Sequence, residues 1–185
     1  MLNKIIIAGA GGQGVMLLGK ILAEAAMRED KFVTWLPSYG AEVRGGTANC
    51  SVVISDEEIG SPIIGSADIL IVLNEPSLVR FQKRVKNNGL IVVNSSLVSS
   101  AVDQGLKVLK QPFSDAAFKL GNIKAANMVA LGCFIAHTGI VSRKTVEEVI
   151  GYLSPADKKE WGRLNTEALA CGINLSNLGK KEVKQ

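Results

Sequence analysis

The sequence predicts an α/β protein with a Rossmann-like, open and mostly parallel sheet, helices on both faces and a helical C-terminal part. The apolar run at residues 5–8 is followed by the glycine-rich residues 9–14 and then by a helical pattern. Nineteen glycines and 5% aromatic residues also suit tight turns between strands and helices. At 185 residues, 47% of them hydrophobic, we expect a single domain, with residues 1–110 forming the sheet and residues 111–185 packed on it.

The pattern of the N-terminal half predicts strands that are separated by turns and by two helices. The first helix is expected over residues 13–28, where Val15, Leu18 and Leu22 recur at helical spacing, and a second over residues 75–85. Pro37 is expected to stop the second strand, and residues 87–89 to form a turn before the fifth. The expected strands cover residues 5–8, 31–36, 48–54, 69–73, 90–93 and, as a short edge strand, 107–110.

The C-terminal part is expected to be helical. Residues 115–120 form a short helix, and residues 125–138 are apolar almost all round, which predicts a buried helix. Ser142 caps a further helix, and the last begins at residues 154–157 and ends at Gly172. Three residues are expected to face inward along the last helix: Trp161, Leu164 and Ala168.

Composition and charge argue against a membrane protein and against a nucleic-acid-binding protein. No apolar run approaches the length of a membrane span, and the start of the chain lacks a signal-type segment, so we expect a cytoplasmic protein without a membrane partner. The net charge of +4 lies partly in the C-terminal tail, and its cations are not interleaved with aromatic residues, so no nucleic-acid partner is expected. The cysteines Cys50, Cys133 and Cys171 lack metal-ligand spacing and are expected to be small buried hydrophobes.

The glycine turn after the first strand is the first candidate site. Glycines at its first, third and sixth positions allow a tight turn, close approach of a ligand to backbone N–H groups, and close packing of helix on strand. The N-terminus of the following helix favours an anion. A nicotinamide cofactor is disfavoured, because such a site needs an acidic residue at the end of the second strand to bind the ribose, and this strand ends with Trp35 and Leu36 instead. The candidate binding residues here are Gly9, Gly11, Gly12, Gln13 and Gly14.

The polar loop at residues 38–47 is the second candidate site. Leaving the carboxyl end of a strand, it is expected to lie beside the glycine turn. The alternative for Glu42 and Arg44 is a surface ion pair. The paired glycines next to Arg44 shift the balance toward anion binding, because they provide backbone that wraps an anion while the guanidinium binds it. The candidate binding residues here are Tyr39, Glu42, Arg44, Gly45 and Gly46.

Catalytic and metal-binding residues are not expected. The one histidine, His137, ends the buried helix, where a structural or exposed role is favoured. Asn127 lies within that helix, and a structural hydrogen bond to a loop and a role at the site both remain open for it.

Together, three segments resemble the gamma subunit of 2-oxoacid:ferredoxin oxidoreductases, and most closely the 2-oxoglutarate type. They are GAGGQGV at residues 9–15, WLPSYGAEVRGGTANC at residues 35–50 and NSSL at residues 94–97. The likeness is strong over residues 3–100 and continues through the helices that follow.

The resemblance implies a reaction in which a 2-oxoacid and coenzyme A (CoA) give an acyl-CoA, carbon dioxide and two electrons for ferredoxin. Thiamine diphosphate and iron–sulfur clusters would lie on alpha, beta and delta type partner subunits, since this chain has no signature for either. Its own share would be one wall of a CoA site, without turnover by itself. Two alternatives stay open: a free-standing nucleotide-binding oxidoreductase, and a purely structural module of the complex.

Overall fold

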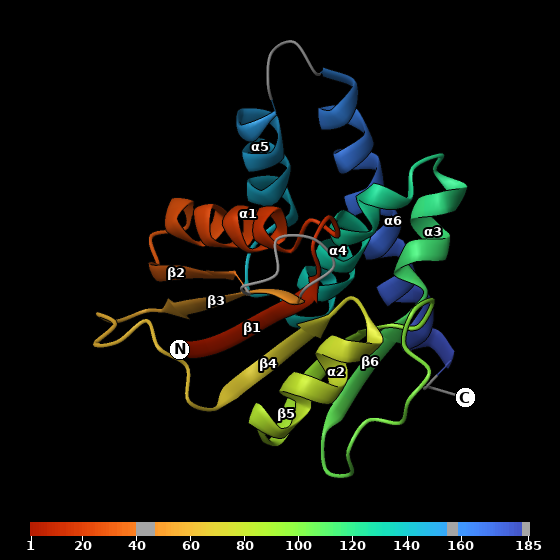
Figure 1. Cartoon of the computed structure of the whole chain (residues 1–185). Helices are drawn as coiled ribbons and strands as arrows, with labels where there is room; N and C mark the ends of the chain where they lie inside the picture. The colour runs from red at the N-terminus through yellow and green to blue at the C-terminus, as the bar shows by residue number, and fades with distance from the viewer. Residues whose placement is uncertain (40–46, 155–158, 183–185) are drawn as a thin grey trace.

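The computed structural model describes residues 1–39, 47–154 and 159–182, and its described strands form one six-stranded sheet in the order β2-β3-β1-β4-β5-β6 (Figure 1). Neighbouring strands from β1 to β6 along this order are parallel, whereas β3 pairs antiparallel with both β1 and β2. The mostly parallel sheet is therefore confirmed, with β3 alone reversed. The strands are β1 (Leu2–Ala10), β2 (Phe32–Tyr39), β3 (Thr47–Ser55), β4 (Ala67–Val72), β5 (Val85–Asn94) and β6 (Lys107–Gln111).

Helices lie on both faces of the sheet, as expected. Alternate residues of β1 point to opposite faces, so Ile5 and Ile7 join one core and Ile6 and Ala8 the other. We name the two sides the α1 face, which most helices cover, and the α2 face, on which α2 packs (Figure 1). The helices are α1 (Val15–Arg28), α2 (Glu75–Phe81), α3 (Phe113–Lys119), α4 (Ala126–Thr138), α5 (Arg143–Leu153) and α6 (Lys159–Glu182), with short 3-10 helices η1 (Gln82–Arg84) and η2 (Ile123–Ala125).

Helix α4 is buried, as its sequence predicts, and it packs most closely against α6. A Cβ atom on Gly132 would lie 2.0 Å from the Leu169 carbonyl oxygen, and one on Gly172 would lie 2.0 Å from that of Val129. The expectation that Gly172 ends the last helix is wrong, because α6 continues to Glu182. Gly172 instead allows the backbones of two helices to approach each other.

Two further expectations along the chain are corrected. Pro37 does not stop the second strand but lies inside β2, which is an edge strand and can accommodate a residue without an N–H group. Residues 87–89 lie inside β5, where Asn88 has a φ of 62° and the pairing with β4 shifts register.

Trp161 does not face fully inward as expected. Its side chain is 42% exposed on α6, whereas Ala168 on the same helix is completely buried. Among the described helices, none is long and apolar enough to cross a membrane.

Candidate functional site

The glycine turn connects β1 to α1 at the carboxyl edge of the sheet. Gly12 and Gly14 have φ values of 91° and 70°, in the left-handed region that favours glycine. The Gln13 backbone N–H donates to the Ala10 carbonyl oxygen at 3.1 Å, and the Ala10 N–H donates to Gln13 Oε1 at 2.7 Å. Both the backbone and the side chain of Gln13 therefore hydrogen-bond to Ala10 and close the turn.

The glycines of this turn serve different purposes. A Cβ atom on Gly9 would lie 2.8 Å from Gln13 Oε1, and one on Gly14 would lie 2.2 Å from Asn127 Nδ2. Packing therefore requires glycine at both positions. A Cβ atom on Gly11 or on Gly12 would meet nothing within 4 Å, and both residues are exposed. The exposed tip of the turn is the part that a ligand can reach.

Helix α1 presents a positive N-terminus beside this tip. Gly14 occupies its N-cap position without a side-chain cap, and the first turn holds no acidic residue. Free N–H groups and the helix dipole together favour an anion at such a terminus.

The ends of β4 and β5 extend the site from the glycine turn. The Leu73 carbonyl oxygen accepts hydrogen bonds from Gln13 Nε2 at 3.3 Å and from Asn94 Nδ2 at 3.1 Å. Asn94 is completely buried and also bonds Ser114, donating to its Oγ at 2.9 Å and accepting from its N–H at 3.2 Å. The Gln13 amide is thus part of the scaffold that joins the strand ends.

A cavity of about 150 Å³ lies against this network. It combines small polar groups with apolar side chains, and Lys124, which is exposed in η2, is its charged member. The lining residues are Gly12, Gln13, Leu73, Asn94, Leu97, Ser114, Ile123, Lys124 and Ala126.

A second cation lies at the same edge, on the α2 face. Arg80 of α2 donates from Nη1 to Thr47 Oγ1 at 2.5 Å, and Thr47 is paired with Ala10 at the end of β1. The η2 helix that carries Lys124 packs against α3 and α4 on the α1 face, so Lys124 and Arg80 lie on opposite sides of the carboxyl edge. Both favour a negatively charged ligand there.

Glu75 is the acidic residue that begins α2 at this edge. Hydrogen bonds from Ser100 and Ser99 lower the pKa of its carboxyl group, so that it stays ionised at neutral pH. Its Oε2 accepts from the Ser99 N–H at 2.8 Å and from the Ser100 N–H at 3.3 Å. This carboxylate is engaged in fixing the segment after β5.

The second predicted loop can be placed only by its ends. Tyr39 is the last residue of β2 and pairs with Ala48, next to the pairing of Ala10 with Thr47. Both ends thus lie at the edge that carries the glycine turn, as expected. The predicted binding residues Glu42, Arg44, Gly45 and Gly46 lie outside the described residues.

The open alternatives for Asn127 and His137 resolve differently. Asn127 is buried and donates from Nδ2 to the Gly14 carbonyl oxygen at 3.1 Å, so it makes the structural hydrogen bond to a loop. His137 is exposed at the other end of α4, about 15 Å away along the helix axis. It therefore has the exposed position that its sequence context favoured.

Chemistry based on cysteine or a metal finds no support in the described residues. Burial raises the pKa of the Cys50 thiol to about 11, and Cys133 is also buried, whereas Cys171 is partly exposed rather than buried. No group of three or more histidine, cysteine, aspartate or glutamate residues in the described ranges could hold a metal ion.

Sequence reasoning did not select Ser114 or Lys124 for the site. Asn94 was noted at a strand end, and such a position at the carboxyl edge is the signal that could have selected it. Ser114 and Lys124 reach the edge from α3 and from η2, and a single sequence does not show this.

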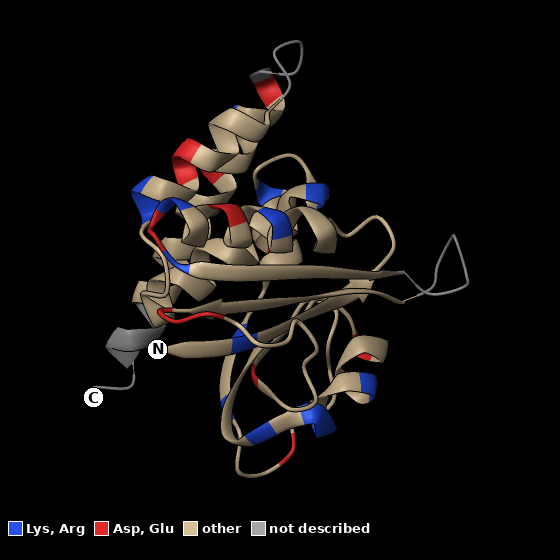
Figure 2. Ribbon diagram, turned by 90° about the vertical axis from the view of Figure 1, so that its left-hand side faces the viewer, with Lys and Arg blue, Asp and Glu red and all other residues tan. Residues whose placement is uncertain are grey.

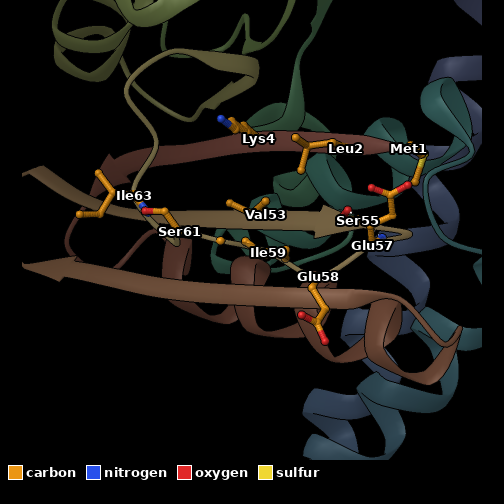
Figure 3. Close-up of a pocket in the computed structure, with 11 residues that line it drawn as sticks. Met1, Leu2, Lys4, Val53, Ser55, Glu57, Glu58, Ile59, Ser61 and Ile63 are labelled. Carbon is orange, nitrogen blue, oxygen red and sulfur yellow. Dashed lines mark hydrogen bonds between the residues drawn. The ribbon is translucent and has the colours of Figure 1, made fainter.

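Two larger hollows lie elsewhere. One of about 320 Å³ is formed by α1, α5 and α6 around Leu17, Leu153 and Trp161. The other, also about 320 Å³, lies at the amino edge of β1 against the segment after β3 (Figure 3). Because the second is at the opposite end of β1, it is separate from the glycine turn.

Comparison with known proteins gives one family. The family model described as pyruvate ferredoxin/flavodoxin oxidoreductase matches residues 4–175. The ketoisovalerate oxidoreductase subunit VorA of Methanothermobacter thermautotrophicus is 37% identical over 179 residues, which cover 89% of this chain and 37% of that relative. The 2-oxoglutarate synthase subunit KorC of Methanothermobacter marburgensis is 34% identical over 189 residues, which cover 98% of this chain and all of that relative.

Solved structures agree with this. The gamma subunit of a keto/oxoacid ferredoxin oxidoreductase from Geobacter sulfurreducens is 31% identical, with a TM-score of 0.83, and the match covers 95% of this chain and 99% of that one. The chain spans little more than a third of the length of the VorA relative, but the full length of the KorC relative.

Proposed function

Because the chain belongs to the pyruvate ferredoxin/flavodoxin oxidoreductase family, we propose that it is the gamma-type subunit of a 2-oxoacid:ferredoxin oxidoreductase. Such an enzyme converts a 2-oxoacid and CoA to an acyl-CoA and carbon dioxide and passes two electrons to ferredoxin. The observation that carries the proposal is the end-to-end match with a solved gamma subunit.

The cofactors of this reaction are assigned to partner subunits of the alpha, beta and delta types. When bound there, thiamine diphosphate supplies the carbon chemistry and iron–sulfur clusters carry the electrons. The residues of this chain do not fit a cluster, because Cys50 and Cys133 are each buried in the hydrophobic core and a group of metal ligands is absent from the described ranges.

We assign to this chain one wall of the CoA site, at the carboxyl edge of its sheet. CoA carries a pyrophosphate and a further phosphate, which suit the uncapped N-terminus of α1 and the exposed tip at Gly11 and Gly12. Lys124 and Arg80 add positive charge on the two sides of that edge, and Arg44 would bind a phosphate from the second loop. Glu42, Gly45 and Gly46 complete the proposed wall.

The 2-oxoacid is proposed to be 2-oxoglutarate. The KorC relative supports this, because it is 34% identical over 189 residues that cover 98% of this chain. Substrate choice itself is assigned to the partner subunits, which would hold the thiamine diphosphate.

Co-expression with the partner subunits tests the proposal. The purified complex is expected to reduce ferredoxin in a reaction that requires both 2-oxoglutarate and CoA, whereas this chain alone is expected to give no turnover. Turnover by the isolated chain would overturn the proposal, and a preference for a branched 2-oxoacid would overturn the choice of 2-oxoglutarate.

The variant Arg44→Ala in the reconstituted complex distinguishes a role in CoA binding from a role in packing between subunits. A raised KM for CoA with intact assembly supports the binding role, whereas loss of assembly favours the alternative of a purely structural module. The expected rise is about tenfold or more, because a charged group would lose its phosphate partner.

The second alternative, a free-standing nicotinamide or flavin enzyme, is disfavoured by the strand order. In a dinucleotide-binding unit, the acidic residue that binds the ribose ends the strand next to the glycine turn. Here β3 lies between β1 and β2, and β3 begins rather than ends at this edge. Retention of a nucleotide by the purified chain would favour this alternative.

A further inference from the structure

One part of the sheet lacks a helical cover on the α2 face. In the described structure, α2 lies over β1 and β4, while β2 and β3 have no helix on that side (Figure 1). Four apolar side chains are exposed there, and we call them the hairpin face: Leu2 (53%), Phe32 (46%), Leu36 (44%) and Ile63 (72%). Exposed apolar residues that gather on one face are typical of a protein interface.

The connections between the strands explain the missing cover. A parallel crossover normally brings a helix onto a face of the sheet, as α1 does between β1 and β2. The antiparallel pair of β2 and β3 needs no crossover, and residues 56–66 between β3 and β4 contain no helix. Instead of a helix, this irregular segment packs on the α2 face through Ile59 and Ile64, and it leaves Phe32 and Leu36 of β2 exposed.

The two edges of the sheet differ in charge. The edge strand β6 carries Lys107 and Lys110, a common protection against unwanted strand pairing. The opposite edge strand β2 and its neighbour β3 contain no charged residue, and both are free of charge colour in Figure 2. An edge without charges is expected where another protein covers it.

A hollow adjoins the hairpin face. The hollow of about 320 Å³ lies between β1, β3 and residues 57–63, with Leu2, Val53 and Ile63 among its lining (Figure 3). Glu57 and Glu58 also line it. With Leu2, Val53 and Ile63 on its apolar side and Lys4, Glu57 and Glu58 on its polar side, it offers a recess to an amphipathic side chain of a docked partner.

We propose that the hairpin face and the β2 edge dock the partner subunit of the same enzyme that corresponds to the remaining part of the VorA relative. This proposal rests on the function proposed above. The size of the VorA relative favours this partner, because this chain matches only 37% of that relative and the rest is joined to it in one polypeptide. A large neighbour is therefore present beside the corresponding domain there, and we assign a neighbour of the same kind to the hairpin face here.

The test is co-purification of the complex with a tagged partner subunit. Phe32→Lys and Leu36→Lys place on β2 a lysine, the residue type that protects the edge strand β6 from strand pairing. Because both side chains are already about half exposed, the isolated variants are expected to fold. Val108→Lys is the matched control, because Val108 is 48% exposed on the α2 face of the other edge strand. Circular dichroism and thermal unfolding of the isolated chains check the fold.

Each β2 variant is expected to weaken binding to the partner about tenfold or more, while Val108→Lys binds as the wild type does. Wild-type binding by the folded β2 variants would overturn the docking proposal but leave the proposed function intact. If the variants abolish only self-association of this chain, the occupant is a second copy and the proposal is wrong. A wild-type chain that never enters the complex would instead overturn the proposed function.

Discussion

Asn127 Nδ2 donates a hydrogen bond to the Gly14 carbonyl oxygen at 3.1 Å, and this bond joins the first turn of α4 to the glycine turn. Asn127 Oδ1 accepts from the Met128 N–H at 3.0 Å, so both ends of the buried amide have partners. The site at the carboxyl edge is thus held in place from the C-terminal half of the chain.

Gly14→Ala is expected to lower the free energy of unfolding by about 2 kcal/mol, because φ is positive and the new methyl group would collide with Asn127. Gly11→Ala is the control from the same turn, since its Cβ atom would meet nothing within 4 Å. It is expected to change stability by no more than about 0.5 kcal/mol. Urea unfolding measures both, and equal losses would contradict this account of the turn.

The close approach of α4 and α6 gives a second prediction. Gly132→Ala and Gly172→Ala are each expected to cost about 3 kcal/mol, because the new methyl groups would press on backbone carbonyl groups that cannot rotate away. Gly151→Ala in α5 meets nothing within 4 Å and is expected to stabilise by about 0.5–1 kcal/mol through helix propensity. The test is a comparison of their melting temperatures with that of the wild type, and melting temperatures of Gly132→Ala and Gly172→Ala close to the wild-type value would contradict the close helix packing.

The strand, glycine turn and helix over residues 5–28 could be predicted because their signals are local. An apolar run, glycines at fixed spacing and a helical repeat all lie within one segment. The strand order could not be predicted, because the insertion of β3 between β1 and β2 depends on pairing between distant residues.

Predictions for single residues were wrong at Gly172 and Pro37, because glycine and proline each have two structural uses. Glycine can end a helix or let two helices approach, and at Gly172 it does the second. Proline stops most strands but fits an edge strand, and only the strand order shows that β2 is one. Gln13, whose predicted role in binding stays a prediction, also closes its own turn with its side chain, and it lines the cavity beside that turn.

The ion pair between Lys31 and Asp56 predicts acid sensitivity. Lys31 Nζ lies 2.5 Å from Asp56 Oδ1, and this hydrogen bond, with a further one from the N-terminal ammonium group, lowers the pKa of Asp56 from 3.8 to about 2. Since the folded carboxyl group has the lower pKa, its contribution to stability is complete above pH 3.8 and is lost as the pH falls through about 2.

Asp56→Asn is therefore expected to reduce the loss of stability between about pH 5 and pH 2, as measured by urea unfolding at each pH. The difference should shrink at high salt, because the pair is exposed. Asp103→Asn is the control, since Asp103 makes no ion pair within the described structure. A pH profile unchanged in Asp56→Asn would contradict the assignment.

A substitution of Lys124 tests the proposed CoA site, because Lys124 is a cation of that site whose position the structure describes. It borders the 150 Å³ cavity, so Lys124→Ala in the assembled enzyme is expected to raise the KM for CoA about three- to tenfold, with kcat unchanged. Lys119→Ala removes an exposed lysine that does not line the cavity, and it should leave both constants as they are. Because phosphate contacts weaken with ionic strength, the difference between the two variants should also fall as salt is added. A lower kcat at unchanged KM would place Lys124 outside the CoA site.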